Sequence, residues 1–371
     1  YDSWLKNNKL VDNADSEGPI LDFIIAGFPK CGTSAMMRYL ATVTTMPPGE
    51  DVCTPISNTV YYSYINWSRK YGNGAHNYTD DKPLRGNKCP KYIEKKDLDD
   101  IGKKLPKSKL IVGIRHPVLW FQSFINMQWH NDGKNNKKYD TPDQYVLLHK
   151  RRIGREQNHK CRNMLVCVPR SRFHLSLARL GKTPLDQDEI DLLQSELRQS
   201  TLRLNDTSAK TWKYPFADNR EKVGVPNKVF IFESSQGNKE YFYQDLAMFL
   251  EFDRARLPPL DNTTYRSGNG INKLEASIKA ATDKVKSVDI CLPQYDVIRK
   301  ELLPISYTLG QWLKQYLIPA SHQRNDLTIP NVTAFESIVE SYARDPCQNR
   351  LVRNDDDGEY YLAEKENATS D

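Results

Sequence analysis

The chain has 371 residues, with 53 Lys and Arg against 47 Asp and Glu, a formal net charge of +6 and a mean hydropathy of −0.68. This length fits one large domain or two small ones, and 20 Tyr, 12 Phe and 6 Trp are enough for a substantial core. No apolar run approaches the roughly 18 residues that cross a bilayer as a helix, which argues against an integral membrane protein.

The first 19 residues are polar, end in Gly18-Pro19 and are predicted to be a flexible lead-in. They begin with YDSWLKNNK, in which no signal peptide is visible. We therefore expect a trimmed or mature form. Any contact with a membrane would then be made through an anchor missing from this chain.

Residues 21–40, LDFIIAGFPKCGTSAMMRYL, predict a buried strand, a glycine-bounded loop over 27–32 and a helix from residue 33. Strand, loop and helix in this order can hold a phosphate, because backbone N–H groups and the helix N-terminus face one concavity. In the loop of nucleoside-triphosphate enzymes the lysine follows the second glycine, whereas here Lys30 lies inside the loop. The sequence thus predicts a loop that binds phosphate but lacks the usual contacts to a nucleoside triphosphate and its magnesium ion. The alternative is an ordinary strand–turn–helix corner.

The following elements are predicted in chain order. Buried strands are expected at 109–115 and 229–233, with a helix opened by Pro117 after the first and a helix over 240–252 after the second. Less regular patterns predict helices near 61–67, 185–203, 272–288 and 294–316, a short extended segment at 88–93, and loops at 72–87, 131–143 and 257–271.

Strands that alternate with helices favour an α/β fold with a parallel sheet. Ligands in such sheets bind at the carboxyl ends of the strands, so residues 27–34, Arg115 and Glu233 are expected on one rim. We expect a single domain over 20–320. Residues 321–371 show no strong pattern and are predicted to be an irregular extension with an acidic, disordered tail.

Cysteines and glycosylation motifs point to the secretory pathway. The seven Cys are compatible with three disulfides and one free thiol; Cys161–Cys167 and Cys291–Cys347 are plausible pairs, and Cys31 is the expected free thiol. Six N-x-[ST] motifs are present, at Asn66, Asn77, Asn205, Asn262, Asn331 and Asn367. A cytosolic enzyme with reduced core cysteines is the alternative.

Positive charge is concentrated in residues 134–172, which hold eleven Lys and Arg against three Asp and Glu. A local basic surface on an otherwise balanced chain favours an anionic ligand or substrate over general nucleic-acid binding. A solvated basic face without a ligand is the alternative.

Three segments share a further pattern: FPKCGTS at 28–34, KCPKY at 88–92 and IRHPVLWFQS at 114–123. Together they resemble the sulfotransferases that use 3′-phosphoadenosine 5′-phosphosulfate, in particular the Golgi carbohydrate branch with its heparan-type enzymes. The resemblance covers roughly residues 20–320. It implies a P-loop-like central parallel sheet flanked by helices, this phosphosulfate as the donor without a metal, and a location in the Golgi lumen or secretory pathway.

The resemblance also implies roles for the matched residues. The loop that binds the 5′-phosphosulfate is matched by Pro29, Lys30, Cys31, Gly32, Thr33 and Ser34. Arg115 and Ser123 match the pair that binds the 3′-phosphate. Lys88 would aid the leaving phosphate or the acceptor; Cys89 replaces the hydroxyl residue that usually follows it. Arg266, in a late basic loop, is a further candidate for the 3′-phosphate.

An acceptor hydroxyl must lose its proton as it attacks sulfur, so a general base is required. The family branch places a His or Glu some twenty residues after the loop lysine, and Glu50 occupies that position. The usual Lys-Glu and the aromatic pair after it are absent, so Asp51 is an alternative base and Glu50 a possible loop carboxylate. His116 and His174 are held in reserve, and for both a structural role is expected.

The sequence therefore predicts a sulfotransferase that acts on a hydroxyl or amine of a carbohydrate, and the basic segment suits an anionic acceptor. No nucleic-acid partner is expected. A small-molecule acceptor is one alternative. A P-loop kinase would need a magnesium-binding Asp at another strand end, but the strand at 229–233 ends in Glu233. A non-catalytic protein that binds anionic glycans is the third alternative.

Overall fold

The computed structural model describes residues 19, 21–40, 43–45, 53, 84–94, 97–129, 170–183, 224–257, 287–348, 351–353 and 360–362. These residues form an α/β fold around one six-stranded sheet, and a separate antiparallel pair near the C-terminus. The pair consists of β7 (Leu351–Arg353) and β8 (Tyr360–Leu362). The predicted class, a P-loop-like parallel sheet flanked by helices, is confirmed.

All neighbouring strands of the large sheet run parallel. In spatial order they are β2 (Thr44–Thr45), β3 (Leu84–Lys88), β1 (Phe23–Gly27), β4 (Lys109–Ile114), β5 (Val229–Glu233) and β6 (Leu327–Thr328). The chain leaves β1 toward one edge of the sheet and later continues at β4 on its other side. A crevice at such a reversal of strand order is where open α/β sheets bind ligands.

The three central strands are hydrophobic on both faces, as strands covered by helices on both sides must be. Along β1, Phe23 and Ile25 pack on one face, and Ile24 and Ala26 pack on the other. This alternation, with a period of two residues, gives the sheet two separate cores.

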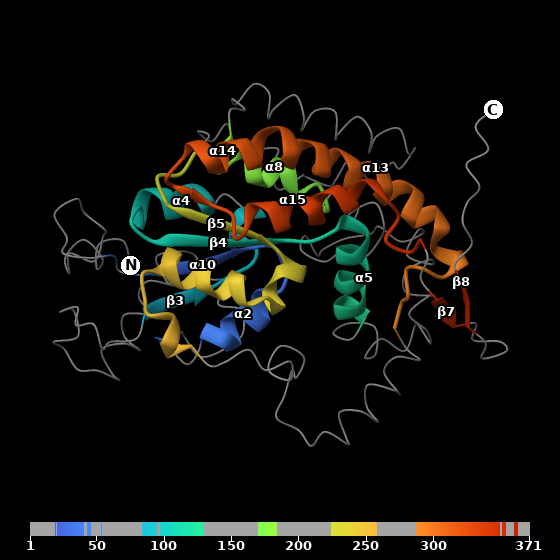
Figure 1. Cartoon of the computed structure of the whole chain (residues 1–371), viewed down its shortest axis with the longest axis horizontal. Coiled ribbons are helices and arrows are strands. Elements are labelled where there is room, and N and C mark those ends of the chain that lie inside the picture. The colour runs from blue at the N-terminus through green and yellow to red at the C-terminus, as the bar shows by residue number, and fades with distance from the viewer. Residues whose placement is uncertain are drawn as a thin grey trace, which may run out of the picture.

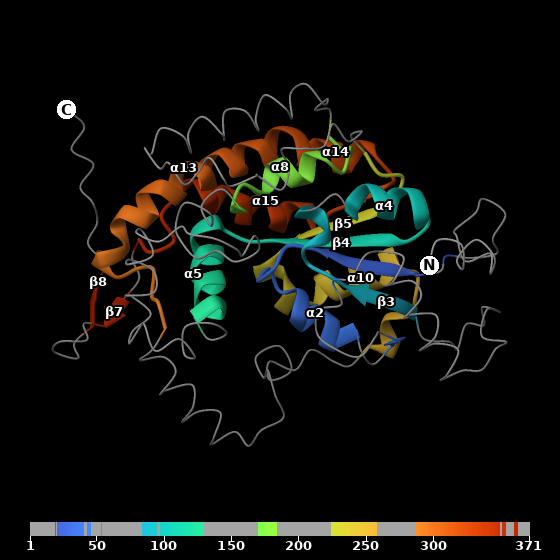
Figure 2. The same cartoon turned by 180° about the vertical axis from the view of Figure 1, so that it is seen from behind.

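Helices cover both faces, as Figures 1 and 2 show from opposite sides. One face carries α2 (Thr33–Leu40) and α10 (Glu240–Leu250). The other face carries α4 (Asp97–Lys104), α8 (Phe173–Ala178), α13 (Asp296–Trp312), α14 (Ile318–Gln323) and α15 (Val332–Glu340). Helix α5 (Pro117–Gln128) stands across the carboxyl end of the sheet, so it closes the rim where a ligand would bind.

Strand β3 begins earlier than predicted, because residues 84–87 were expected to be loop. Its sequence, LRGNK, contains one apolar side chain and does not read as a strand. The strand forms because it pairs with β1. Gly86 permits the pairing, since a Cβ at this position would lie 2.2 Å from Cζ of Phe23.

Residues 321–348 are more regular than the sequence suggested, because they contain β6, α15 and the 3₁₀ turn η9 (Ser341–Ala343). The amide of Asn331 caps α15 by accepting a hydrogen bond from the backbone N–H of Ala334. The helix buries Phe335 and Val339, four residues apart. A two-residue strand and a nine-residue helix give too few periodic positions to be recognised. The predicted domain boundary at residue 320 stays a prediction.

Several predictions fall outside the described residues. They concern Glu50, Asp51, Arg266, the Cys161–Cys167 pair, all the glycosylation motifs except that at Asn331, most of the basic segment 134–172, the helices near 61–67 and 185–203, most of the helix at 272–288, and the loop at 131–143. Within the described parts of the chain, no helix is long and apolar enough to cross a membrane.

Candidate active site

The loop between β1 and α2 has the strand–loop–helix form predicted for it. Lys30 and Gly32 both adopt left-handed backbone conformations, with φ of 67° and 82°. Gly32 adopts this conformation at no steric cost, whereas a lysine there is unusual. Non-glycine residues in sparsely populated conformations are concentrated at active sites and ligand clamps, which makes Lys30 a candidate functional residue on backbone grounds alone.

Strand β4 and helix α5 hold this loop in place. The backbone N–H of Phe28 donates to the carbonyl of Gly113 (2.9 Å), and the indole N–H of Trp120 donates to the carbonyl of Pro29 (2.7 Å). A Cβ on Gly113 would lie only 2.5 Å from the carbonyl oxygen of Cys31, so a glycine is needed for the loop to lie this close to β4.

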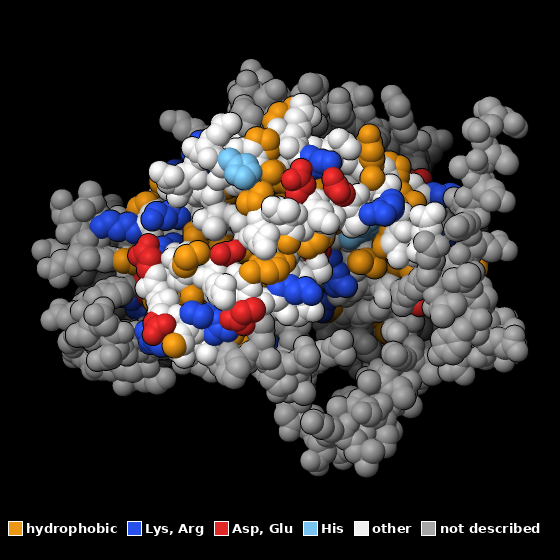
Figure 3. Space-filling view, in the orientation of Figure 1, with side chains coloured by type: hydrophobic (Ala, Val, Ile, Leu, Met, Phe, Trp, Pro, Cys, Tyr) orange, Lys and Arg blue, Asp and Glu red, His pale blue; other side chains and the backbone are white. Residues whose placement is uncertain are grey.

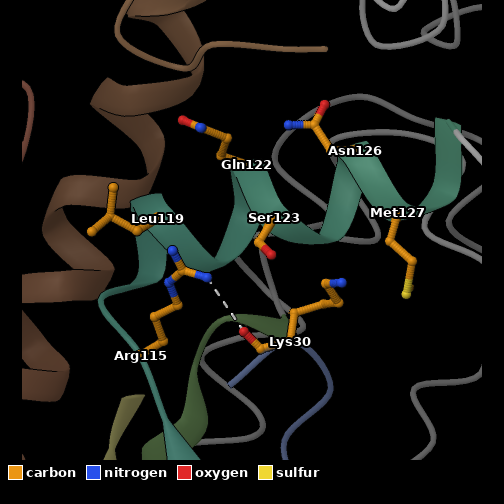
Figure 4. A pocket seen from close by; sticks show the side chains of 7 residues that line it. All are labelled: Lys30, Arg115, Leu119, Gln122, Ser123, Asn126 and Met127. Atoms are coloured by element: carbon orange, nitrogen blue, oxygen red, sulfur yellow. Dashed lines mark hydrogen bonds between the residues drawn. The ribbon is translucent and has the colours of Figure 1, made fainter. Parts of the chain in front are cut away.

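A pocket of about 410 Å³ lies between the loop and α5 (Figure 4). Its lining residues are Lys30, Arg115, Leu119, Gln122, Ser123, Asn126 and Met127. They include two cations and no carboxylate, a composition that favours an anionic ligand. The pocket thus brings together Lys30, Arg115 and Ser123. The resemblance of their sequence motifs assigned these residues to two phosphate sites of one donor.

Arg115 follows the last residue of β4, and its guanidinium donates to the main-chain carbonyl of Lys30 (3.5 Å). Ser123 lies on α5 and points toward Arg115 and Lys30 in Figure 4. A planar guanidinium beside a helix hydroxyl can bind a phosphate with several charge-assisted hydrogen bonds. On the face shown in Figure 3, Lys and Arg side chains gather at a hollow near the carboxyl end of the sheet.

Lys88 approaches the loop from the other side. It ends β3 and is 3% exposed, and its ammonium group lies 2.7 Å from the hydroxyl of Ser34, the second residue of α2. The structure therefore places a second cation at the N-terminus of the helix that follows the loop. The ammonium group of Lys88 and the N-terminus of α2 are both positive, so both would stabilise an anion bound by the loop.

His116 and His174 have structural environments. The Nδ1 atom of His116 accepts a hydrogen bond from the backbone N–H of Val118 and caps α5. Burial lowers the pKa of His116 to about 4, although the backbone of Arg344 and the charge of Asp345 oppose this. His174 is enclosed in α8, where burial lowers its pKa to about 3. Neither histidine lines the pocket.

Tyr342 forms a buried contact beneath the site that the sequence did not reveal. This side chain of η9 is 1% exposed, and its ring meets that of His116 edge-on, with centroids 5.0 Å apart. Burial raises the pKa of the Tyr342 hydroxyl, and the nearby Glu233 carboxylate raises it further. A residue from late in the chain thus packs against the histidine that caps α5.

No protein-family model and no curated protein matches this chain. Among solved structures, it is similar to the crystal structure of a sulfotransferase from Alicyclobacillus acidocaldarius. The two share 15% sequence identity over a match that covers 72% of this chain and 93% of that chain, with a TM-score of 0.28. The function is therefore inferred from the geometry of the site itself.

Two disulfides flank the site. The predicted bond between Cys291 and Cys347 is present, and Cys31 is a buried thiol outside any disulfide, as expected. The bond between Cys53 and Cys89 was not predicted. It joins the residue after Lys88 to a segment 36 positions earlier, and the KCPKY motif gave no sign that its cysteine is paired.

Sequence reasoning also missed four residues of the pocket wall, namely Leu119, Gln122, Asn126 and Met127. These residues and Ser123 recur mostly every three or four positions, the spacing of one side of a helix. This periodicity could have predicted them once Ser123 was assigned to the site. In the described part of the chain, no group of three or more His, Cys, Asp and Glu side chains could hold a metal ion.

Proposed function

We propose that this protein is a sulfotransferase that moves a sulfuryl group from 3′-phosphoadenosine 5′-phosphosulfate to a hydroxyl or amine of a carbohydrate acceptor. The observation that carries the proposal is the single pocket lined by Lys30, Arg115 and Ser123. These residues come from motifs about 85 to 95 positions apart, and the resemblance assigned them to opposite ends of the same donor.

The proposed reaction assigns a role to each of the three cations, Lys30, Lys88 and Arg115. Negative charge builds on the leaving phosphate as the S–O bond breaks, and a lysine held inside the loop can stabilise that charge. Lys88, anchored on Ser34, would aid the same leaving group or orient the acceptor. Arg115 and Ser123 would hold the 3′-phosphate and so fix the position of the donor.

Glu50 remains the proposed general base, with Asp51 as the alternative. The described residue that follows them, Cys53, is covalently bonded to Cys89 next to Lys88. This bond holds Cys53 at the Lys88 end of β3, and the closeness of Glu50 and Asp51 to Cys53 in the sequence supports the choice of these two carboxylates. Neither histidine lines the pocket, and the lowered pKa that burial gives each makes it a weak proton acceptor, which argues against either as the base.

A carbohydrate acceptor in the Golgi lumen or secretory pathway is proposed on three grounds. They are the resemblance to the carbohydrate branch, the presence of two disulfides, which persist in oxidising compartments, and the glycosylation motifs. The basic segment at 134–172 favours an anionic glycan. A small-molecule acceptor, sulfated by the same donor site, is the alternative.

The proposal is tested by incubating the purified protein with donor carrying radiolabelled sulfate and a panel of glycan and small-molecule acceptors. Lys30→Ala should lower kcat by about 100- to 1,000-fold, the usual cost of removing one group that stabilises developing charge. Lys107→Ala, which removes an exposed lysine in the turn before β4, is the matched control and should keep wild-type turnover. Near-wild-type turnover by Lys30→Ala would show that the assigned role is wrong. Heparin binding without any transfer would favour a glycan-binding protein.

A further inference from the structure

Two side chains of the pocket helix bind a segment from far along the chain. The amide of Asn126 accepts a hydrogen bond from the backbone N–H of Val288 (2.7 Å) and donates one to the carbonyl of the same residue (2.9 Å). The amide oxygen of Gln122 accepts a hydrogen bond from the backbone N–H of Ile290 (3.1 Å). The two amides therefore satisfy alternate backbone groups of 288–290, as a neighbouring strand would.

The same two residues line the pocket, together with Arg115 and Ser123. Gln122 and Asn126 are four positions apart and so lie on the same side of α5, one turn from each other. In Figure 4 the side chains of Gln122 and Asn126 point away from Lys30 and Arg115, whereas that of Ser123 points toward them. Helix α5 thus presents Ser123 to the two cations of the pocket, while two amides of the same pocket wall hold the helix to residues 288–290.

The segment that these amides bind is itself firmly anchored. The side chains of Val288 and Ile290 are buried in the larger core, and Cys291 is bonded to Cys347. The guanidinium of Arg299 donates to the carbonyl of Ile290 (2.8 Å) and is ion-paired with Asp345 (3.3 Å). Because the segment cannot shift easily, it is a suitable fixed point for α5.

We infer that Gln122 and Asn126 are positioning residues that hold α5 against residues 288–290 and so set where Arg115 and Ser123 meet a phosphate. The inference rests on the proposed function, because it concerns the binding of the 3′-phosphate of that donor. Neither amide has to touch the donor. A phosphate bound bidentately tolerates little displacement of its donors, so a small shift of α5 weakens binding.

The test uses Asn126→Ala in the full chain, with calorimetric titration of adenosine 3′,5′-bisphosphate and amide hydrogen exchange. The variant should weaken bisphosphate binding about threefold to tenfold, because it removes two hydrogen bonds that hold α5 and only part of their free energy acts on the binding site. It should also speed exchange at the N–H of Val288. In the transfer assay, KM for the donor should rise by a similar factor while kcat stays within about twofold, because the reacting groups are untouched.

Two further variants separate positioning from general loss of stability and from charge. Asn227 makes an equivalent contact at the opposite end of the sheet, where its amide donates to the carbonyls of Leu105 and Ser108 (both 2.7 Å). Asn227→Ala should lower the melting temperature yet leave bisphosphate affinity within about twofold. Gln122→Glu keeps an acceptor for Ile290, so the exchange rate of that N–H should stay near the wild-type rate while the added negative charge weakens bisphosphate binding.

The outcomes are distinguishable. If the wild-type protein binds no bisphosphate, the proposed function fails, and the inference fails with it. If the wild type binds the bisphosphate but Asn126→Ala binds it equally well, the inference alone is wrong. An equal loss of affinity in Asn227→Ala and Asn126→Ala would also contradict it, because both would then act through stability.

Discussion

Lys30 and Arg115 act at the scale of single residues, and their positions are set by backbone as much as by side chain. The left-handed conformation of Lys30 places a lysine where a glycine would be expected, in the middle of a phosphate loop. Arg115 is placed by the end of β4 and bonds the carbonyl of that same lysine. The guanidinium of Arg115 is therefore held against the backbone of the loop before any ligand arrives, which lowers the cost of binding an anion.

The buried histidines make stability depend on pH. In the unfolded chain both side chains titrate near 6.5, whereas in the folded protein burial keeps His116 and His174 neutral down to about pH 4 and about pH 3. Below about pH 6.5 the unfolded state binds more protons, so the free energy of unfolding should fall by up to about 1.4 kcal/mol per pH unit for each histidine. Urea unfolding at pH 7.5, 6.0 and 5.0 measures this slope.

His174→Leu provides the control for that prediction, because it removes one of the two titrating groups without leaving a cavity. It should reduce the loss of unfolding free energy between pH 6.0 and 5.0 by about half. An unchanged slope in this variant would mean that His174 is protonated in the folded protein or that other groups dominate.

At the scale of elements, the site depends on the close approach of the phosphate loop to β4. Gly113→Ala would place a Cβ 2.5 Å from the carbonyl oxygen of Cys31 and 2.7 Å from the Phe232 ring. We expect a loss of about 1–3 kcal/mol in the free energy of unfolding, together with weaker bisphosphate binding, because the loop must move away from the strand. Chemical denaturation and calorimetry on the same preparation measure both effects.

Gly102→Ala is the comparison for Gly113→Ala. Gly102 lies in α4, where the nearest atom to an added Cβ is a methyl group of Val225 at 3.0 Å. The gain in helix propensity offsets part of this crowding, so the change in unfolding free energy should be smaller and bisphosphate affinity should stay at the wild-type value. Equal effects of the two variants would contradict the importance of the contact between the loop and β4.

The elements that surround the candidate site could be predicted from sequence. The strands β1, β4 and β5 are continuous apolar runs followed by glycine, proline or polar residues, and α5 opens with Pro117. Elements that depend on tertiary contacts could not be predicted. Strand β3 has almost no apolar side chains, and α15 buries only two.

The candidate site was predictable in part, for a similar reason. Lys30, Arg115 and Ser123 belong to short motifs with a characteristic spacing, so the sequence could assign them before the pocket was seen. Gln122 and Asn126 contact a segment more than 160 positions away, and no local pattern reports such a contact. The Cys53–Cys89 bond is equally hidden, because spacing alone does not determine which cysteines pair.

At the scale of the whole molecule, the C-terminal residues complete the structure around the site. The bond between Cys291 and Cys347 joins the segment held by α5 to the residues that follow η9, and η9 packs Tyr342 against His116 at the start of α5. Residues separated by more than 300 positions thus share one core. The fold around the pocket is therefore closed by a covalent bond rather than by packing alone.

Removal of this bond should be costly. Cys291→Ser combined with Cys347→Ser should lower the free energy of unfolding by about 2–5 kcal/mol, since the bond closes a loop with a sequence separation of 56 residues. Guanidinium denaturation without reductant measures the loss, and mass spectrometry of unreduced peptides verifies the bond in the wild type. A denaturation midpoint equal to that of the wild type would show that the bond does not constrain the folded chain.

We propose that one pocket binds both ends of a bisphosphorylated adenosine without a metal. Calorimetry in the presence of a chelator, with adenosine 3′,5′-bisphosphate and adenosine 5′-monophosphate as ligands, tests it most directly. The wild type should bind the bisphosphate at least about tenfold more tightly, and Arg115→Ala should remove that preference while barely changing the affinity for the monophosphate. Equal affinities for the two ligands in the wild type, or tighter binding of ATP with magnesium, would contradict the claim.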